Sequence, residues 1–157
     1  MKKKKKYLSL FVAVLVFVLG YIVIGASRGA NNTQIAHAAT IYKSPTCGCC
    51  GNYVTYLKRY GYDVEVVDIE DMDSVKREYN IPQDMESCHT TVTDEGYVVE
   101  GHIPVEAMNK LLEEKPVVNG IAMPGMPVGS PGMPGTKNGK FIIHQLDIEG
   151  TSEFMQL

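Results

Sequence analysis

Residues 41–50 read IYKSPTCGCC, and this stretch decides the fold. A short strand predicted for Thr40–Lys43 is broken by Pro45 and followed by three cysteines within four positions. Beyond the cysteines, apolar side chains recur at helical spacing over residues 52–60, and Gly61 follows as a helix-ending residue. The cysteines therefore lie between a predicted strand and the start of a predicted helix.

The next part of the chain predicts five more elements with short connections. They are a half-buried strand from Tyr62 towards Ile69, a helix from Asp71 to Ile81-Pro82, a hairpin of residues 90–93 and 97–99, and a helix that begins at Pro104. The resulting order, β-α-β-α-β-β-α, is the arrangement of thioredoxin-like domains. We therefore expect an α/β fold of this class.

Residues 116–139 differ in composition from the rest of the chain. They hold five prolines and six glycines in 24 positions, which predicts an irregular loop. Loops of this length are often functional. Residues 141–148 predict a last strand, so the expected fold carries an extra Pro/Gly/Met-rich loop and a C-terminal strand.

The N-terminal region has the pattern of an export signal. Lys2–Lys6 precede an apolar run of 18 residues, Tyr7–Ile24, which is about the minimum length for spanning a bilayer. We expect residues 1–38 to form a hydrophobic anchor and tether, with the lysines in the cytoplasm and residues 39–157 forming an extracytoplasmic, thioredoxin-like domain. Cleavage near Ala38, which would give a secreted protein, is the alternative.

The charges of the chain are divided between these two regions. Residues 39–157 hold 9 basic and 18 acidic residues, so this part carries a formal net charge of −9. A domain this acidic repels phosphate, which excludes nucleic acid as an expected partner.

The spacing of the four cysteines favours a metal or redox site over a disulfide scaffold. Cys47, Cys49 and Cys50 are too close together to staple distant loops. At a helix start, free N–H groups and the helix dipole stabilise thiolates. Cys88 precedes the third predicted strand, at the position that faces the Cys-x-x-Cys motif in thioredoxin-like folds and usually holds a cis-proline.

Four thiolates within reach of one site predict a soft metal. Thiolates select Cu(I), Zn(II) or iron–sulfur clusters. Zinc generally takes four tetrahedral ligands, and Cys-x-Cys-Cys is crowded around one such ion. Because Cu(I) accepts two or three sulfurs and shares bridging thiolates, the crowding favours Cu(I) over Zn(II).

Further candidate ligands lie near the cysteines in the expected fold. His89 follows Cys88 directly, and His102 precedes the third helix as either a ligand or a helix-capping residue. Met126 and Met133, in the Met-Pro-Gly loop, offer thioethers that can bind Cu(I) where thiols would oxidise. The alternative is that these methionines fill gaps under an irregular loop.

Four motifs, in order, resemble the family known as domain of unknown function 411. They are residues 41–50, Ser87-Cys88-His89-Thr90, residues 100–104 (EGHIP) and residues 125–133 (GMPVGSPGM). The resemblance covers roughly Ala39 to Leu146 and implies a thioredoxin-like, metal-binding protein associated with copper resistance and handling. It implies that Cys47, Cys49, Cys50 and Cys88 bind the metal, with Met126 and Met133 in the family's Met-Pro loop.

Two functions follow as hypotheses. The first is an extracytoplasmic protein that binds Cu(I) through the cysteine cluster, for copper handling or resistance, with copper-transport or redox proteins as partners. The alternative is a thiol–disulfide oxidoreductase, in which Cys47 attacks and Cys50 resolves, coupled to the oxidation state of copper. A zinc site, or a purely structural pair of disulfides, is a third reading of the same cysteines.

Overall fold

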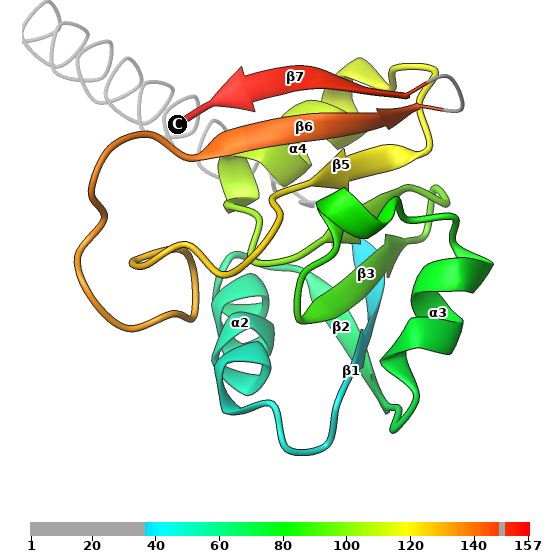
Figure 1. Ribbon diagram of the computed structural model, residues 1–157. Coiled ribbons are helices and arrows are strands. Elements are labelled where there is room, and N and C mark those ends of the chain that lie inside the picture. Colours follow the sequence, from blue (N-terminus) through cyan, green and yellow to red (C-terminus); the bar gives the residue numbers. More distant parts are fainter. Residues whose placement is uncertain (1–36, 148–149) are drawn as a thin grey trace, which may run out of the picture. The chain divides into compact units, whose positions relative to one another are not determined.

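Seven strands of the described residues form one mixed sheet in the order β2-β1-β3-β4-β5-β6-β7 (Figure 1). The computed structural model describes residues 37–147 and 150–157. The strands are β1 (Ala38–Lys43), β2 (Asp63–Asp68), β3 (His89–Thr93), β4 (Val98–Glu100), β5 (Gly120–Ala122), β6 (Ile142–Asp147) and β7 (Gly150–Gln156). The helices are α2 (Gly48–Arg59), α3 (Met72–Glu78), α4 (Val105–Glu114) and the 3₁₀ turn η1 (Gln83–Met85).

The pairing of the strands confirms the predicted thioredoxin-like order. Strand β1 runs parallel to β2 and antiparallel to β3. Strands β3 and β4 form the predicted antiparallel hairpin, and α4 follows β4. The β-α-β unit places α2 between β1 and β2, so the cysteine motif lies at the carboxyl end of β1.

The predicted irregular loop and C-terminal strand are both present, but two strands of the C-terminal third were not predicted. The segment 116–139 contains β5, which pairs with β4 in parallel through the crossover helix α4. The single strand predicted at 141–148 is the first strand of a β6–β7 pair. Strand β5 has only three residues, all buried, so it carries no alternating pattern, and its partner is distant in sequence.

The two faces of the sheet bury separate apolar clusters. The larger cluster joins the sheet to α2 and α4, and the smaller one lies on the opposite face with Ile81 and Met85. In β4, Val99 faces the larger cluster and Val98 the smaller one, as expected for a strand buried on both sides. The predicted inner face of α4 is confirmed, because its members are all buried: Val105, Met108, Leu111 and Leu112.

The helix ends follow the local sequence. The Asp71 side chain accepts a hydrogen bond from the Ser74 N–H and caps α3. Gly61, in the left-handed region at φ +90°, ends α2 as predicted. Pro104 is the N-cap of α4.

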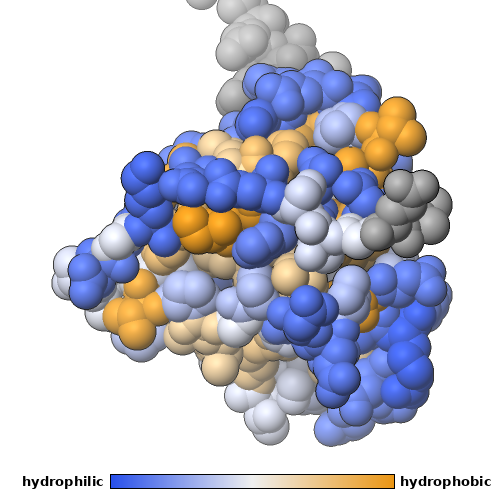
Figure 2. Space-filling model, turned by 45° about the horizontal axis from the view of Figure 1, so that its top comes forward, coloured by the Kyte–Doolittle hydropathy of each residue, from blue (hydrophilic) through white to orange (hydrophobic). Residues whose placement is uncertain are grey.

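The predicted anchor at residues 7–24 lies outside the described residues, as does most of the tether. Among residues 37–147 and 150–157, no helix has the length and apolar character needed to cross a bilayer. The face in Figure 2 is mostly hydrophilic, with apolar side chains in separate patches.

Candidate metal and thiol centre

The start of α2 holds three of the four cysteines. Cys47 is the N-cap residue, and Cys49 and Cys50 lie in the first turn. The first-turn N–H groups of a helix lack partners within the helix, and they stabilise a negative sulfur nearby. Cys50 is fully buried, whereas Cys47 and Cys49 are partly exposed.

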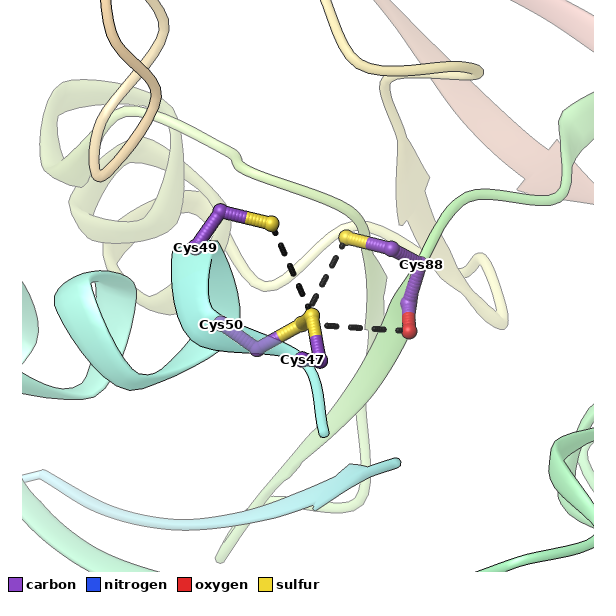
Figure 3. Close-up of side chains that lie close together, drawn as sticks. All are labelled: Cys47, Cys49, Cys50 and Cys88. Carbon is purple, nitrogen blue, oxygen red and sulfur yellow. Dashed lines mark hydrogen bonds between the residues drawn. A yellow bond between two sulfur atoms is a disulfide. The ribbon is translucent and has the colours of Figure 1, made fainter. Parts of the chain in front are cut away.

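A disulfide joins Cys47 to Cys50, and two further sulfurs flank it (Figure 3). The Cys49 Sγ lies 3.5 Å from the Cys47 Sγ, and the Cys88 Sγ lies 3.6 Å from the Cys50 Sγ. Cys49 and Cys88 are free thiols. All four sulfurs lie within 4.8 Å of one another, so a single cluster of metal ions could contact the whole set after reduction of the disulfide.

Cys88 reaches this group from the second half of the domain. It directly precedes β3, and its sulfur lies beside that of Cys49, next to the disulfide (Figure 3). Burial raises the pKa of the Cys88 thiol to about 11, with the neighbouring Cys49 adding to the shift. The structure thus brings together the four predicted cysteines, and metal binding by them stays a prediction.

His102 lies against Cys88 with one defined tautomer. Its Nδ1 is 2.6 Å from the Pro131 carbonyl oxygen, which can only accept, so Nδ1 carries the proton. The unprotonated Nε2 therefore points at the Cys88 Sγ, 3.0 Å away, and accepts its hydrogen bond. Burial lowers the pKa of His102, which keeps the ring neutral. The helix-capping alternative is wrong, since His102 contacts the thiol.

His89 also faces the site. Its Nδ1 lies 3.4 Å from the Cys88 Sγ, and its ring packs at 4.7 Å from the ring of Tyr53. Its Nε2 is buried and has no hydrogen-bond partner in the described part of the chain. Burial lowers the pKa of His89 well below its ordinary value. With Cys50, Cys88 and His102, it forms a second set of four donors within 4.8 Å.

Glu100 fixes the position of the loop that carries Cys88. Its fully buried carboxylate accepts hydrogen bonds from the Ser87 N–H at 2.6 Å and the Thr90 hydroxyl at 2.7 Å, and pairs with buried Lys76 of α3. Burial raises the pKa of Glu100. Ser87 and Thr90 lie on either side of Cys88 and His89 in the sequence. These contacts of the Glu100 carboxylate, which we call the Glu100 clamp, therefore hold Cys88 and His89 toward the disulfide. This role of Glu100 was not predicted from the sequence, where its signal is an acid beside two valines in a short buried strand.

The Met-rich loop docks against the site at two points. The Ser87 hydroxyl donates to the Gly125 carbonyl, and further along the Asn52 side chain donates to the Gly132 carbonyl at 3.3 Å. Gly132 adopts φ +81°, and a Cβ there would lie 2.9 Å from the Cys49 carbonyl oxygen. The loop therefore lies directly against the first turn of α2.

The methionines of this loop have different surroundings. Met123 is buried in the main core, as expected for a gap-filling residue. Met126 is 52% exposed, and Met133 is partly buried. Each directly follows in sequence a glycine whose carbonyl is held at a docking point, and their ligand role stays a prediction.

Two family models match successive parts of the chain, and the four cysteines are divided between them. Residues 39–82 match the glutaredoxin family, and residues 85–133 match the family described as "Protein of unknown function, DUF411". A solved structure named "Copper resistance protein copG- Form 2" is 36% identical, with a TM-score of 0.71, covering 77% of this chain and 98% of its own. The chain belongs to the DUF411 family.

A second solved structure of this relative agrees with the first. "Copper resistance protein copG- Form 1" is 37% identical, with a TM-score of 0.70, covering 76% of this chain and 96% of its own. A search of curated proteins found no significant match. The thioredoxin-like fold expected from the sequence is therefore shown by both the glutaredoxin match and the structural relatives.

Proposed function

We propose that this protein handles copper outside the cytoplasm by binding Cu(I) through Cys47, Cys49, Cys50 and Cys88. One observation carries the proposal: the four sulfurs, from two distant parts of the sequence, lie within 4.8 Å of one another. A redox pair needs two sulfurs, and the two additional ones have no redox role in a simple Cys-x-x-Cys exchange. The two solved structures of a relative named "Copper resistance protein copG" support the same metal.

The donor set favours Cu(I) over Zn(II). Sulfurs separated by one residue cannot easily spread to four tetrahedral corners around one ion, whereas they can bridge neighbouring Cu(I) ions. The buried imidazoles of His89 and His102 are neutral and add borderline nitrogen donors beside Cys88. The Cu(I) ions would then be held by thiolates, with the two imidazole nitrogens on the Cys88 side of the site.

Binding by all four sulfurs requires the reduced protein. In the disulfide, the sulfurs of Cys47 and Cys50 have no negative charge to offer a metal. Reduction supplies two thiolates at the start of α2, where the helix dipole stabilises them. The oxidation state of this pair therefore controls the capacity for copper.

A competition titration tests the proposal. The reduced full-length protein is titrated with Cu(I) against a chelator of known affinity, in parallel with the protein carrying the Cys47–Cys50 disulfide. We expect tight binding of more than one equivalent by the reduced form only. Equal affinity in both forms, or no competition with the chelator, would remove the cysteine cluster as the copper site.

We also propose that the domain is extracytoplasmic and remains anchored. The basic residues Lys2–Lys6 followed by an apolar run support export. Ala38 belongs to β1, and its carbonyl accepts the Asp94 N–H at 3.0 Å, so cleavage after Ala38 would cut inside the strand. Protease added outside intact cells should digest the domain. In untreated cells, the protein should be found in the membrane fraction. A protected domain would contradict export, and a soluble one would favour cleavage.

Thiol–disulfide exchange is the second candidate function. The Cys47–Cys50 disulfide at a helix start, in a segment that matches glutaredoxin, supports it. Cys47 is partly exposed and is suited to attack, while buried Cys50 is suited to resolve the mixed disulfide. Reduction of a model disulfide by the wild type, lost in Cys47→Ser, would establish this activity, and failure to reduce any would exclude it.

A further inference from the structure

The two sulfurs of the disulfide are accessible to different thiols. Cys50 is fully buried, so a thiol from solvent or from a partner protein reaches Cys47 instead. One free thiol of this chain, however, lies beside the buried sulfur, since the Cys88 Sγ is 3.6 Å from the Cys50 Sγ. Attack on a disulfide sulfur requires such direct access by the nucleophile. Cys88 therefore has the contact that an external thiol lacks.

A base is in place for this thiol. The His102 Nε2 lies 3.0 Å from the Cys88 Sγ, and the Pro131 carbonyl fixes the tautomer that leaves Nε2 unprotonated. A nucleophile, a base in contact with it and a third group that orients the base form the arrangement of activated cysteine nucleophiles. Because the His102 Nε2 is in direct contact with this thiol, the proton of Cys88 passes to His102 as the sulfur attacks.

We propose that the disulfide migrates within the site, from Cys47–Cys50 to Cys50–Cys88. The Cys88 sulfur forms a bond with the Cys50 sulfur, the Cys47–Cys50 bond breaks, and Cys47 leaves as a thiolate. The proton of Cys88 goes to the His102 Nε2 and then to Cys47 or water. One disulfide and two thiols are present before and after, so no external oxidant or reductant is consumed.

The product has a different chemical capacity from the starting form. Cys47 becomes free beside Cys49, whose Sγ lies 3.5 Å away, at the partly exposed start of α2. Two adjacent thiolates are enough for Cu(I), which accepts low coordination numbers. Resting on the proposed function, the migration therefore changes which two thiolates the oxidised protein offers to Cu(I), from Cys49 and Cys88 to Cys47 and Cys49, both at the start of α2.

Tryptic mapping can follow the migration directly. Cys47, Cys49 and Cys50 share the peptide of residues 44–58, and Cys88 lies in the peptide of residues 78–110. The starting disulfide lies within the first peptide, whereas the migrated one links the two peptides. Metal-free full-length protein with one disulfide is moved from acid to mildly alkaline buffer, quenched with acid at intervals, alkylated, digested and analysed by tandem mass spectrometry.

We expect the linked peptides to appear with time, with fragment ions that assign the bond to Cys50 and Cys88. His102→Gln should slow their formation about 100-fold, the contribution of a positioned base, whereas His144→Gln, a histidine on β6 outside the site, should leave the rate unchanged. A disulfide that stays within residues 44–58 in the wild type would overturn the proposal. Because this assay contains no copper, it can fail or succeed independently of the Cu(I) titration.

Discussion

The glutaredoxin-like first half and the DUF411 second half contribute differently to the same site. Residues 39–82 supply a disulfide at a helix start, which is sufficient for thiol exchange. Residues 85–133 supply what surrounds it, namely Cys88, two neutral imidazoles and a docked loop. Under the proposed function, a common redox motif becomes a metal site through donors placed against it by a distant segment.

The largest effect on the site is expected from removing the Cys50 sulfur, because both halves of the site contact it. Cys50 belongs to the disulfide and to both four-donor sets. Cys50→Ser should abolish the disulfide and weaken Cu(I) binding by more than about 100-fold, beyond the loss caused by changing groups that only support a ligand. Thiol counting and chelator competition measure the two losses. Cys49→Ser is the comparison, since it should keep the disulfide and lose only metal affinity.

The second half depends on the Glu100 clamp for its geometry. Glu100→Ala leaves the buried ammonium of Lys76 unpaired, which should lower the free energy of unfolding by about 3–5 kcal/mol. Urea unfolding measures it. Glu106→Ala, at an exposed position of α4, is the control and should change stability by less than about 0.5 kcal/mol.

A loss at Glu100 no larger than at Glu106 would mean that the clamp does not hold the Cys88 loop. Glu100→Gln sharpens the same point, because the amide keeps the shape and can still accept the Ser87 N–H. It should retain more stability and more Cu(I) affinity than Glu100→Ala.

The docking of the loop on α2 can be separated from backbone strain. Gly132 and Gly139 both adopt φ +81°, but a Cβ at Gly132 would meet the Tyr53 backbone nitrogen at 2.7 Å, whereas one at Gly139 meets open space. Gly132→Ala should therefore cost at least about 1 kcal/mol more than Gly139→Ala. Thermal unfolding compares the two, and equal costs would show that the loop does not need its contact with α2.

A single hydrogen bond between the halves should have the smallest effect. The buried Tyr53 hydroxyl donates to the Ile103 carbonyl at 2.8 Å. Tyr53→Phe should lower the free energy of unfolding by about 1 kcal/mol. Tyr60→Phe, at a position 54% exposed, is the matched control and should have almost no effect. Urea unfolding measures both variants, and equal losses in the free energy of unfolding would contradict the expectation.

The sequence predicted the first half of the fold better than the end. Spacing, Asp71 and Gly61 were enough for β1 to α3, because each signal is local. Strand β5 was missed because only its distant partner β4 makes Gly120–Ala122 a strand. Strand β7 was missed because its mostly exposed residues at the sheet edge carry no apolar pattern.

The same distinction holds for the site. The approach of Cys88 to the Cys-x-x-Cys pair could be expected from the fold class, since the loop before β3 has a known place in it. The roles of Glu100 and of the Pro131 carbonyl could not, because each acts through a contact that only folding creates. Such contacts have no signature in the spacing of residues.

The most direct test of the central claim is Cu(I) titration of the reduced full-length protein beside its Cys88→Ser variant. If the second half completes the metal site, the wild type should bind more than one equivalent of Cu(I) tightly. Cys88→Ser should lose both affinity and stoichiometry while its Cys47–Cys50 disulfide still forms on oxidation. Unchanged affinity and stoichiometry in Cys88→Ser would contradict the account, because the Cys-x-Cys-Cys motif alone would then hold the copper.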